Sequence, residues 1–170
     1  MAWTTPRTWV AGELVTATML NTHIRDNLNY LYGGGTSASW TPTVTFDTAG
    51  NLSIVYAVRY GLYIKQGQLV VLHTYISTST FTFTTASGGL RITGLPFPAQ
   101  STNDVAGGGL IWRGITKASY THMTPVIQGL TQSMYINASG SGQTPSTISA
   151  TDTPSGGTLV LAFSLGYITP

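Results

Sequence analysis

The chain has 170 residues, of which 42% are hydrophobic and 7% charged, and its formal net charge is +2. This length suits one domain with a small appendage, and the absence of cysteine excludes a disulfide framework and a thiolate metal site. Lysine and arginine are scattered singly, which argues against a nucleic-acid partner.

Hydroxyl side chains take the place of charged ones. Thr occurs 29 times and Ser 15 times, so together they make up 44 of the 170 residues, whereas about 25% of a typical soluble domain is charged. Such a surface lacks the charge that keeps a free monomer soluble, and we infer that much of it is covered in an assembly. The longest apolar run, 158–168, is too short to span a bilayer, and the first residues do not read as a secretion signal. We therefore expect no membrane insertion.

Three parts follow one another along the chain. Residues 1–15 read as an extended arm with Trp and Pro, and residues 16–32 read as a helix. Gly33 to Gly35 and the following TSAS segment are expected to form a flexible break, and from Trp40 onward the pattern is that of strands. This divides the chain into an N-terminal arm and helix, 1–35, and a β-sandwich domain, 36–170.

The helix has recognisable signals at both ends. Thr16 is a suitable N-cap, and Val15 and Leu20 stand at the two positions of a hydrophobic staple. Gly33 is expected to supply a left-handed C-terminal cap. One apolar stripe runs along the helix, formed by Leu20, Ile24, Leu28 and Leu31.

A helix of this length, about 24 Å, is marginal by itself in water, so its stripe needs a surface to pack against. That surface is either the chain's own β domain or another polypeptide, including further copies of the chain. The loose glycine tether favours the second interpretation. The predicted oligomerisation residues are accordingly Val15, Leu20, Ile24, Leu28 and Leu31.

Alternating apolar residues and turn signals predict a mainly β fold for the rest of the chain. Strands are expected at 41–46, 52–58, 60–65, 68–77, 80–85, 89–93, 108–115, 125–130, 132–137 and 158–168. A short hairpin turn is expected at 65–68, and the Ser/Thr/Gly-rich segment 137–157 is expected to be a long loop. Short strands at this spacing are typical of an antiparallel β-sandwich of jelly-roll type.

Few residues are suited to catalysis. The carboxylates are Glu13, Asp26, Asp47, Asp104 and Asp152, and His23, His73 and His122 have no recognised metal-binding spacing. We therefore expect no catalytic residue, no metal and no cofactor. Aromatic residues are better candidates for binding: Trp112 and Tyr120, with Arg113, could contact a sugar or a protein surface. The alternative for Trp112 is a place in the sandwich core.

The N-terminal stretch resembles a motif of tailed-bacteriophage structural proteins. The matching residues are Trp9, Gly12, Glu13, Thr16, Ala17, Leu20 and Asn21, and HIRDNL at 23–28 continues the pattern. The β part is similar to C-terminal domains of phage fibres and virion adhesins, through GLYIKQGQLV at 61–70 and GLPF at 94–97. Together these segments cover 8–28 and about 60–98.

This resemblance implies a homotrimer, made in the cytoplasm of the bacterial host and located on the virion. It implies attachment to the virion through Trp3, Trp9, Glu13, Thr16 and Asn21, and partners among the proteins of the tail baseplate or the major capsid protein. Two functions remain open, of which the motif in the β part favours the first. One is a tail-associated fibre or adhesin that contacts a glycan or protein of the host surface, and the other is a capsid decoration, or cement, protein that stabilises the head.

Overall fold

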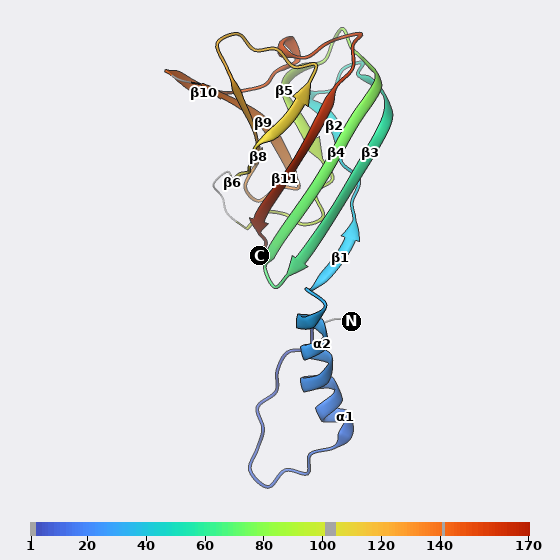
Figure 1. Cartoon of the computed structure of the whole chain (residues 1–170), viewed down its shortest axis with the longest axis vertical. Coiled ribbons are helices and arrows are strands. Elements are labelled where there is room, and N and C mark those ends of the chain that lie inside the picture. Colours follow the sequence, from blue (N-terminus) through green and yellow to red (C-terminus); the bar gives the residue numbers. More distant parts are fainter. Residues whose placement is uncertain (1–2, 101–104, 141) are drawn as a thin grey trace.

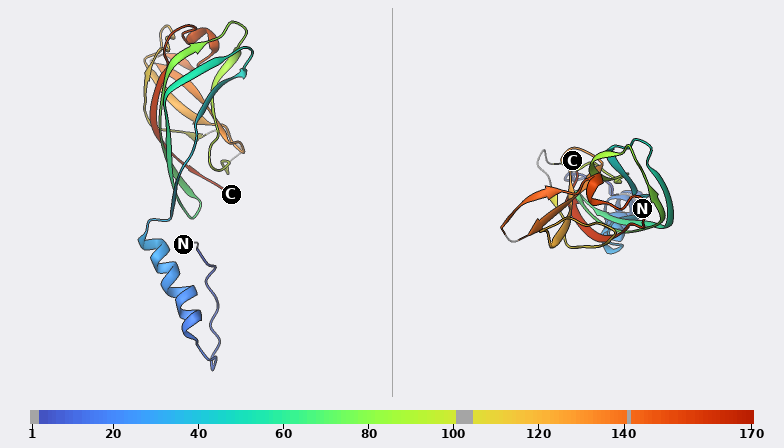
Figure 2. Two further views of the ribbon diagram at one scale, coloured as in Figure 1. Left: turned by 90° about the vertical axis from the view of Figure 1, so that its right-hand side faces the viewer. Right: turned by 90° about the horizontal axis from the view of Figure 1, so that it is seen from above.

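The computed structural model describes residues 3–100, 105–140 and 142–170, with side chains described for all of these except 105 and 106. The molecule is elongated, because a helix projects from one end of a β domain and continues its long axis (Figures 1 and 2). No helix in the described part of the chain is long and apolar enough to cross a membrane.

The helix occupies residues 17–32, close to the predicted range. It consists of α1 (Ala17–Leu20), a π-helical turn η1 (Asn21–Arg25) and α2 (Asp26–Tyr32). The predicted cap is present, since Oγ1 of Thr16 accepts a hydrogen bond of 3.3 Å from the backbone N–H of Met19. The π-helical turn was not predicted.

The glycine run forms a turn, and the prediction of a left-handed Gly33 was wrong, as was the assignment of TSAS to the break between the helix and the strands. Gly33 has φ −73°, while Gly34 and Gly35 have φ of +73° and +93°. The backbone of Gly35 passes so close to β3 that an added Cβ would lie 2.2 Å from the carbonyl oxygen of Lys65, so only glycine fits there. The TSAS segment then forms β1 (Thr36–Ser39), which pairs with β3.

The strands form two antiparallel sheets packed face to face (Figure 2), which confirms the predicted antiparallel β-sandwich. The first sheet has the order β1-β3-β4-β11-β7. Its further strands are β3 (Ser53–Gln66), β4 (Leu69–Thr82), β7 (Leu110–Arg113) and β11 (Val160–Ile168). The second sheet has the order β2-β5-β9-β8-β6, with β10 added to β9. Its strands are β2 (Thr43–Thr48), β5 (Ser87–Thr93), β6 (Val105–Ala106), β8 (His122–Ile127), β9 (Ser133–Gly140) and β10 (Gln143–Thr147).

β3 and β4 are each one long strand where the sequence predicts two. Register shifts beside Tyr56 bend the pair without ending it. Gly61 does not interrupt β3; it makes room for Trp40, whose Nε1 an added Cβ would approach to 2.6 Å. The predicted hairpin turn at 65–68 is confirmed, with Gly67 at φ +58° between the two strands.

The segment 137–157 is not the single long loop that was predicted. β9 extends into it as far as Gly140, β10 returns alongside β9, and a short 3₁₀-helix, η2 (Ala150–Asp152), follows. Ile148 anchors the segment: its side chain is fully buried, and its carbonyl accepts a 2.7 Å hydrogen bond from the N–H of Leu90. Burial of one apolar side chain thus orders a stretch whose composition resembles a loop.

The core lies between the two sheets and is continuous. Its largest fully buried side chains include Leu72, Ile76, Phe81, Leu90, Ile92, Met134, Ile136 and Leu161. Tyr56 and Tyr63 pack against it from the first sheet, whereas Tyr75 points to the outside and is 42% exposed.

Candidate functional site

The helix stripe lies uncovered in the single chain. Val15, Leu20, Ile24, Leu28 and Leu31, the predicted oligomerisation residues, are between 43% and 59% exposed. The helix lies beyond the end of the β domain rather than against a sheet (Figure 2). The structure therefore does not use the β domain to cover the stripe, and five aliphatic side chains are available to another polypeptide.

Another side of the helix is covered, because the arm runs back alongside it (Figure 2). Asn27 is only 5% exposed, and its side chain pairs with the backbone of Thr4: Oδ1 accepts from the Thr4 N–H at 2.9 Å, and Nδ2 donates to the Thr4 carbonyl at 2.8 Å. Nδ2 also donates to the carbonyl of His23 at 3.1 Å. A buried amide that pairs with both backbone polar groups of one arm residue in this way fixes the position of the arm.

Aromatic contacts support the arm at two further points. The rings of Trp3 and Tyr30 lie 5.9 Å apart, and the ring of Trp9 meets that of His23 edge to face at 6.5 Å. The two tryptophans still remain 46% and 41% exposed. Both predicted attachment tryptophans are thus held in place by the helix with part of each ring open to a partner.

The remaining predicted attachment residues are placed differently. Glu13 closes the turn of the arm, because it forms an ion pair with Arg7 and accepts a 3.2 Å hydrogen bond from the Val10 N–H. Thr16 caps the helix. Asn21 is exposed beside the stripe and lines a shallow hollow of about 400 Å³ with Leu20, Ile24 and Leu28. Glu13 and Thr16 therefore have structural roles within the N-terminal arm and helix, while Asn21 is open to a partner.

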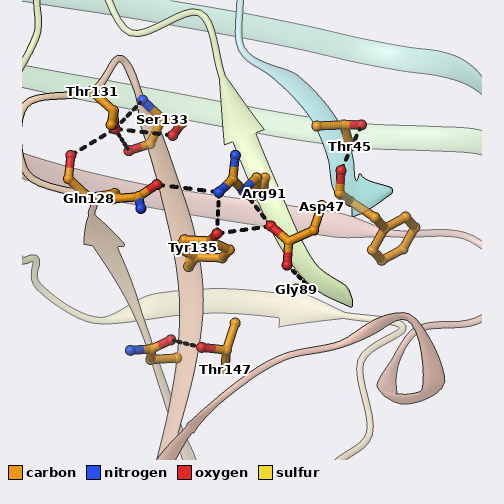
Figure 3. Close-up of polar contacts among 11 residues, drawn as sticks. Thr45, Asp47, Gly89, Arg91, Gln128, Thr131, Ser133, Tyr135 and Thr147 are labelled. Carbon is orange, nitrogen blue, oxygen red and sulfur yellow. Dashed lines mark hydrogen bonds and ion pairs between the residues drawn. The ribbon is translucent and has the colours of Figure 1, made fainter. Parts of the chain in front are cut away.

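A second group of polar residues lies on the outer surface of the second sheet (Figure 3). Nε of Arg91, on β5, lies 2.7 Å from Oδ1 of Asp47, on β2. The hydroxyl of Tyr135, on β9, donates to the same oxygen at 2.8 Å, and the Gly89 N–H donates to Oδ2 at 2.6 Å. Arg91 also hydrogen-bonds to the Tyr135 hydroxyl and, at 3.3 Å, to Oε1 of Gln128. Three strands distant in sequence are joined by this cluster.

Electrostatics favour the charged forms of Asp47 and Arg91 in this cluster. Partial burial acts to raise the pKa of Asp47, but hydrogen bonds from Gly89 and Tyr135 and the charge of Arg91 outweigh it, and the pKa lies below its ordinary value. The hydrogen bond with Tyr135 is the largest cause that raises the pKa of Arg91. Both groups thus stay charged at neutral pH. Their polar atoms are mostly engaged with each other, which indicates a structural role.

The predicted ligand-contact residues do not form one site. Trp112 packs against the core, as in the alternative interpretation, whereas Arg113 follows it in β7 and is exposed on the other face of the sheet. Tyr120 also packs against the core and donates a 2.9 Å hydrogen bond to the carbonyl of Thr144.

Comparisons with known proteins give a likeness in fold. No family model matches the chain, and a search of curated proteins finds no match. Among solved structures, the chain is similar to the Dettilon tailspike protein, with a TM-score of 0.53 and 14% sequence identity. The match covers 76% of this chain and 23% of the tailspike chain, so the chain spans less than a quarter of that protein's length.

Proposed function

We propose that this chain is a non-enzymatic structural protein of a bacteriophage virion, assembled as a homotrimer and associated with the tail as a fibre or adhesin. The N-terminal arm and helix attach it to a tail protein and to its own copies, and the β domain contacts the host surface. The observation that carries the proposal is the helix that projects from the β domain with its aliphatic stripe uncovered.

Two further features support this proposal. The fold of the chain is similar, over 76% of its length, to part of a tailspike protein. The described carboxylates are occupied in ion pairs, namely Glu13 with Arg7, Asp26 with Arg25, Asp47 with Arg91, and Asp152 with Lys117. Asp104 lies outside the described residues. A pair of carboxylates converging on a substrate, as a glycosidase requires, is therefore not offered by the described part of the chain.

The oligomeric role of the helix is tested with the full chain carrying Leu20→Asp and Ile24→Asp. Association should bury the half-exposed side chains, each contributing about 1 kcal/mol, and a carboxylate in the same place adds a desolvation cost. We expect the wild type to sediment as a trimer and the double variant as a monomer. Leu14→Asp is the matched control, because Leu14 is 83% exposed in the arm and lies outside the stripe. A double variant that stays trimeric would refute this role of the helix.

Placement on the particle is tested by immunogold labelling and by quantitative mass spectrometry of purified virions. A tail protein is expected at the tail in a few to tens of copies, in a multiple of three. Hundreds of copies over the head would contradict the tail placement and indicate a capsid decoration protein instead. Binding of the purified trimer to host cells tests the adhesin role, and an intact trimer that does not bind would count against it.

A further inference from the structure

The outer surface of the first sheet is apolar along most of its length. Strand alternation turns Val70, Leu72 and Ile76 of β4 into the core, where they are fully buried, and turns their neighbours outward. The outward side chains form what we call the apolar face. Its members are Val58, Tyr60, Leu62 and Ile64 of β3, Leu69, Val71 and Tyr75 of β4, Ile111 of β7 and Ile168 of β11, each between 37% and 74% exposed.

Strand register makes this face continuous. Tyr60 lies opposite Tyr75, Tyr75 opposite Ala162, and Ala162 opposite Ile111, so one row crosses four strands. Further along the sheet, Ile64 lies opposite Val71, and Leu69 opposite Ile168. A shallow hollow of about 520 Å³ opens along the first row, lined in part by Tyr60, Tyr75 and Ile111 and, beside them, by His73 and Ser164. A hollow with this lining suits an apolar side chain from a partner.

Charge is nearly absent from the apolar face. On the outward positions of β3, β4, β7 and β11, as far as the structure describes them, the only charged side chain is Arg113 at the end of β7. His73 is held by a 2.6 Å hydrogen bond between its Nδ1 and the hydroxyl of Ser164. Contiguous apolar surface of this kind is uncommon on monomers and marks an interface.

Two observations identify the occupant as further copies of the same chain. The helix and the first sheet, whose outer surface is the apolar face, lie on the same side of the molecule, while the arm lies towards the second sheet (Figures 1 and 2). β3 and β4 also run roughly along the long axis that the helix continues (Figure 1). A rotation axis that brings the helices together therefore brings the apolar faces towards the same axis.

The small size of the helix stripe also indicates that further copies of the chain cover the apolar face. Stable interfaces bury about 800 Å² per partner and involve about 20–30 residues on each side. The stripe and Val15 together offer five aliphatic side chains, which is far short of this, and the apolar face supplies surface of the same chemistry. We propose that the apolar face is the second part of the homotrimer interface and packs against the equivalent region of two further copies. This inference rests on the proposed function, because it starts from a helix-mediated trimer.

The first test uses single charged substitutions in the full chain. Ile111 is 74% exposed and Leu62 39% exposed, so Ile111→Asp should leave the fold of the chain intact, and Leu62→Asp provides a second site on another strand. Each should raise the concentration at which the trimer dissociates by at least about tenfold, as measured by analytical ultracentrifugation. Leu130→Asp is the matched control: Leu130 is 58% exposed in the β8–β9 turn and has φ +60°, which Asp tolerates. Circular dichroism confirms that each variant is folded.

A second test measures the accessibility of a single thiol and does not depend on weakening the trimer. The chain has no cysteine, so Ile111→Cys and Leu130→Cys each introduce the only thiol. At concentrations where the protein is a trimer, maleimide should react with the thiol at position 111 at least about tenfold more slowly than after dilution to monomers, whereas the thiol at position 130 should react equally fast in both states.

The outcomes separate this inference from the proposed function. If the helix variants dissociate but the Ile111 and Leu62 variants remain as tightly associated as wild type, with a reactive thiol at position 111, the apolar face is not part of the interface and the proposed function stands. If the face variants stay trimeric but lose binding to host cells, the face binds the host and the inference is overturned. If the wild type is monomeric at every concentration, the trimer in the proposed function fails, and this inference fails with it.

Discussion

The N-terminal arm and helix differ from the β domain in which side chains they bury. In the β domain, large apolar residues such as Leu72, Phe81 and Met134 are fully buried between two sheets. In the helix, the aliphatic stripe is exposed, and the buried residue is the polar Asn27.

This difference shows which region can fold without help. The β domain buries a continuous set of apolar side chains between its two sheets within one chain, although the apolar face stays exposed, and this burial is the main source of folding free energy. The arm and helix gain little from apolar burial and are held by hydrogen bonds and ring contacts, so their full stability requires a partner. If the comparison is correct, equivalent substitutions in the two regions should have different consequences.

The largest difference is expected between Leu72→Ala and Leu28→Ala. Leu72 is fully buried in β4, so its truncation should lower the free energy of unfolding of the β domain by about 2–5 kcal/mol. Leu28 is 59% exposed, and its truncation should change the same quantity by less than about 0.5 kcal/mol while weakening the trimer. Urea denaturation followed by the β-sheet circular dichroism signal measures both. Equal losses would mean that helix and β domain unfold as one unit.

A smaller difference is expected for two carboxylates. Asp47→Asn removes the negative charge and one of the two acceptor oxygens that contact Gly89, Tyr135 and Arg91, and we expect a loss of about 1–3 kcal/mol in the free energy of unfolding. Asp26→Asn breaks an exposed pair with Arg25, whose side chain is 59% exposed, and should cost at most about 1 kcal/mol. Denaturant titration at neutral pH compares them. A loss for Asp26→Asn as large as that for Asp47→Asn would contradict the assignment of a structural role to the cluster.

At low pH, Asp47→Asn should no longer lower the free energy of unfolding. The pKa of Asp47 is lowered in the folded chain from its ordinary value of 3.8, so the carboxylate contributes stability above that value and loses it as the pH falls through the lowered pKa. The difference in unfolding free energy between wild type and Asp47→Asn should therefore be constant above about pH 5 and shrink below about pH 4. Asp152, whose pKa is also lowered, is present in both proteins and cancels in this difference.

The elements that the sequence predicts are those with a local pattern. The helix has a cap at Thr16 and a periodic stripe, and strands such as β4 and β11 alternate apolar and polar residues, so both are recognisable without tertiary information. β1 and β10 have no such pattern, because TSAS and QTPST contain no large apolar residue. They become strands only through the edges they pair with, β3 and β9.

The residues of the candidate site also divide into those that the sequence predicts and those that it does not. The stripe could be predicted from its spacing, but Asn27 could not, because its partner Thr4 is 23 positions away and reaches it only when the arm folds back. The Asp47–Arg91–Tyr135 cluster likewise depends on the order of β2, β5 and β9. The separation of Trp112 from Arg113, however, follows from strand periodicity alone, since adjacent residues in a strand point to opposite faces.

Asn27→Ala should release the arm and leave the β domain unchanged. The substitution removes three hydrogen bonds of a buried amide, and we expect a loss of about 1–2 kcal/mol in the local stability of the arm. Trypsin cleavage after Arg7 should then accelerate by about tenfold, as followed by mass spectrometry. Asn29→Ala is the control on the same helix, because Asn29 is exposed. If both variants are cleaved at the wild-type rate, Asn27 does not hold the arm.

The smallest effect is expected at the start of the helix. Thr16→Ala removes the oxygen that accepts the Met19 N–H, and because this bond is long, at 3.3 Å, the loss of helix stability should be near the low end for a cap, about 0.5 kcal/mol. Thr18→Ala, inside α1, should act in the opposite direction, since alanine has the higher helix propensity. Amide hydrogen exchange at Met19 measures both in the monomer: faster exchange for Thr16→Ala and slower exchange for Thr18→Ala. In a helix already stabilised by burial, differences this small would not be detected. Two unchanged exchange rates would therefore show that the helix is stable in the monomer, and would contradict its dependence on a partner.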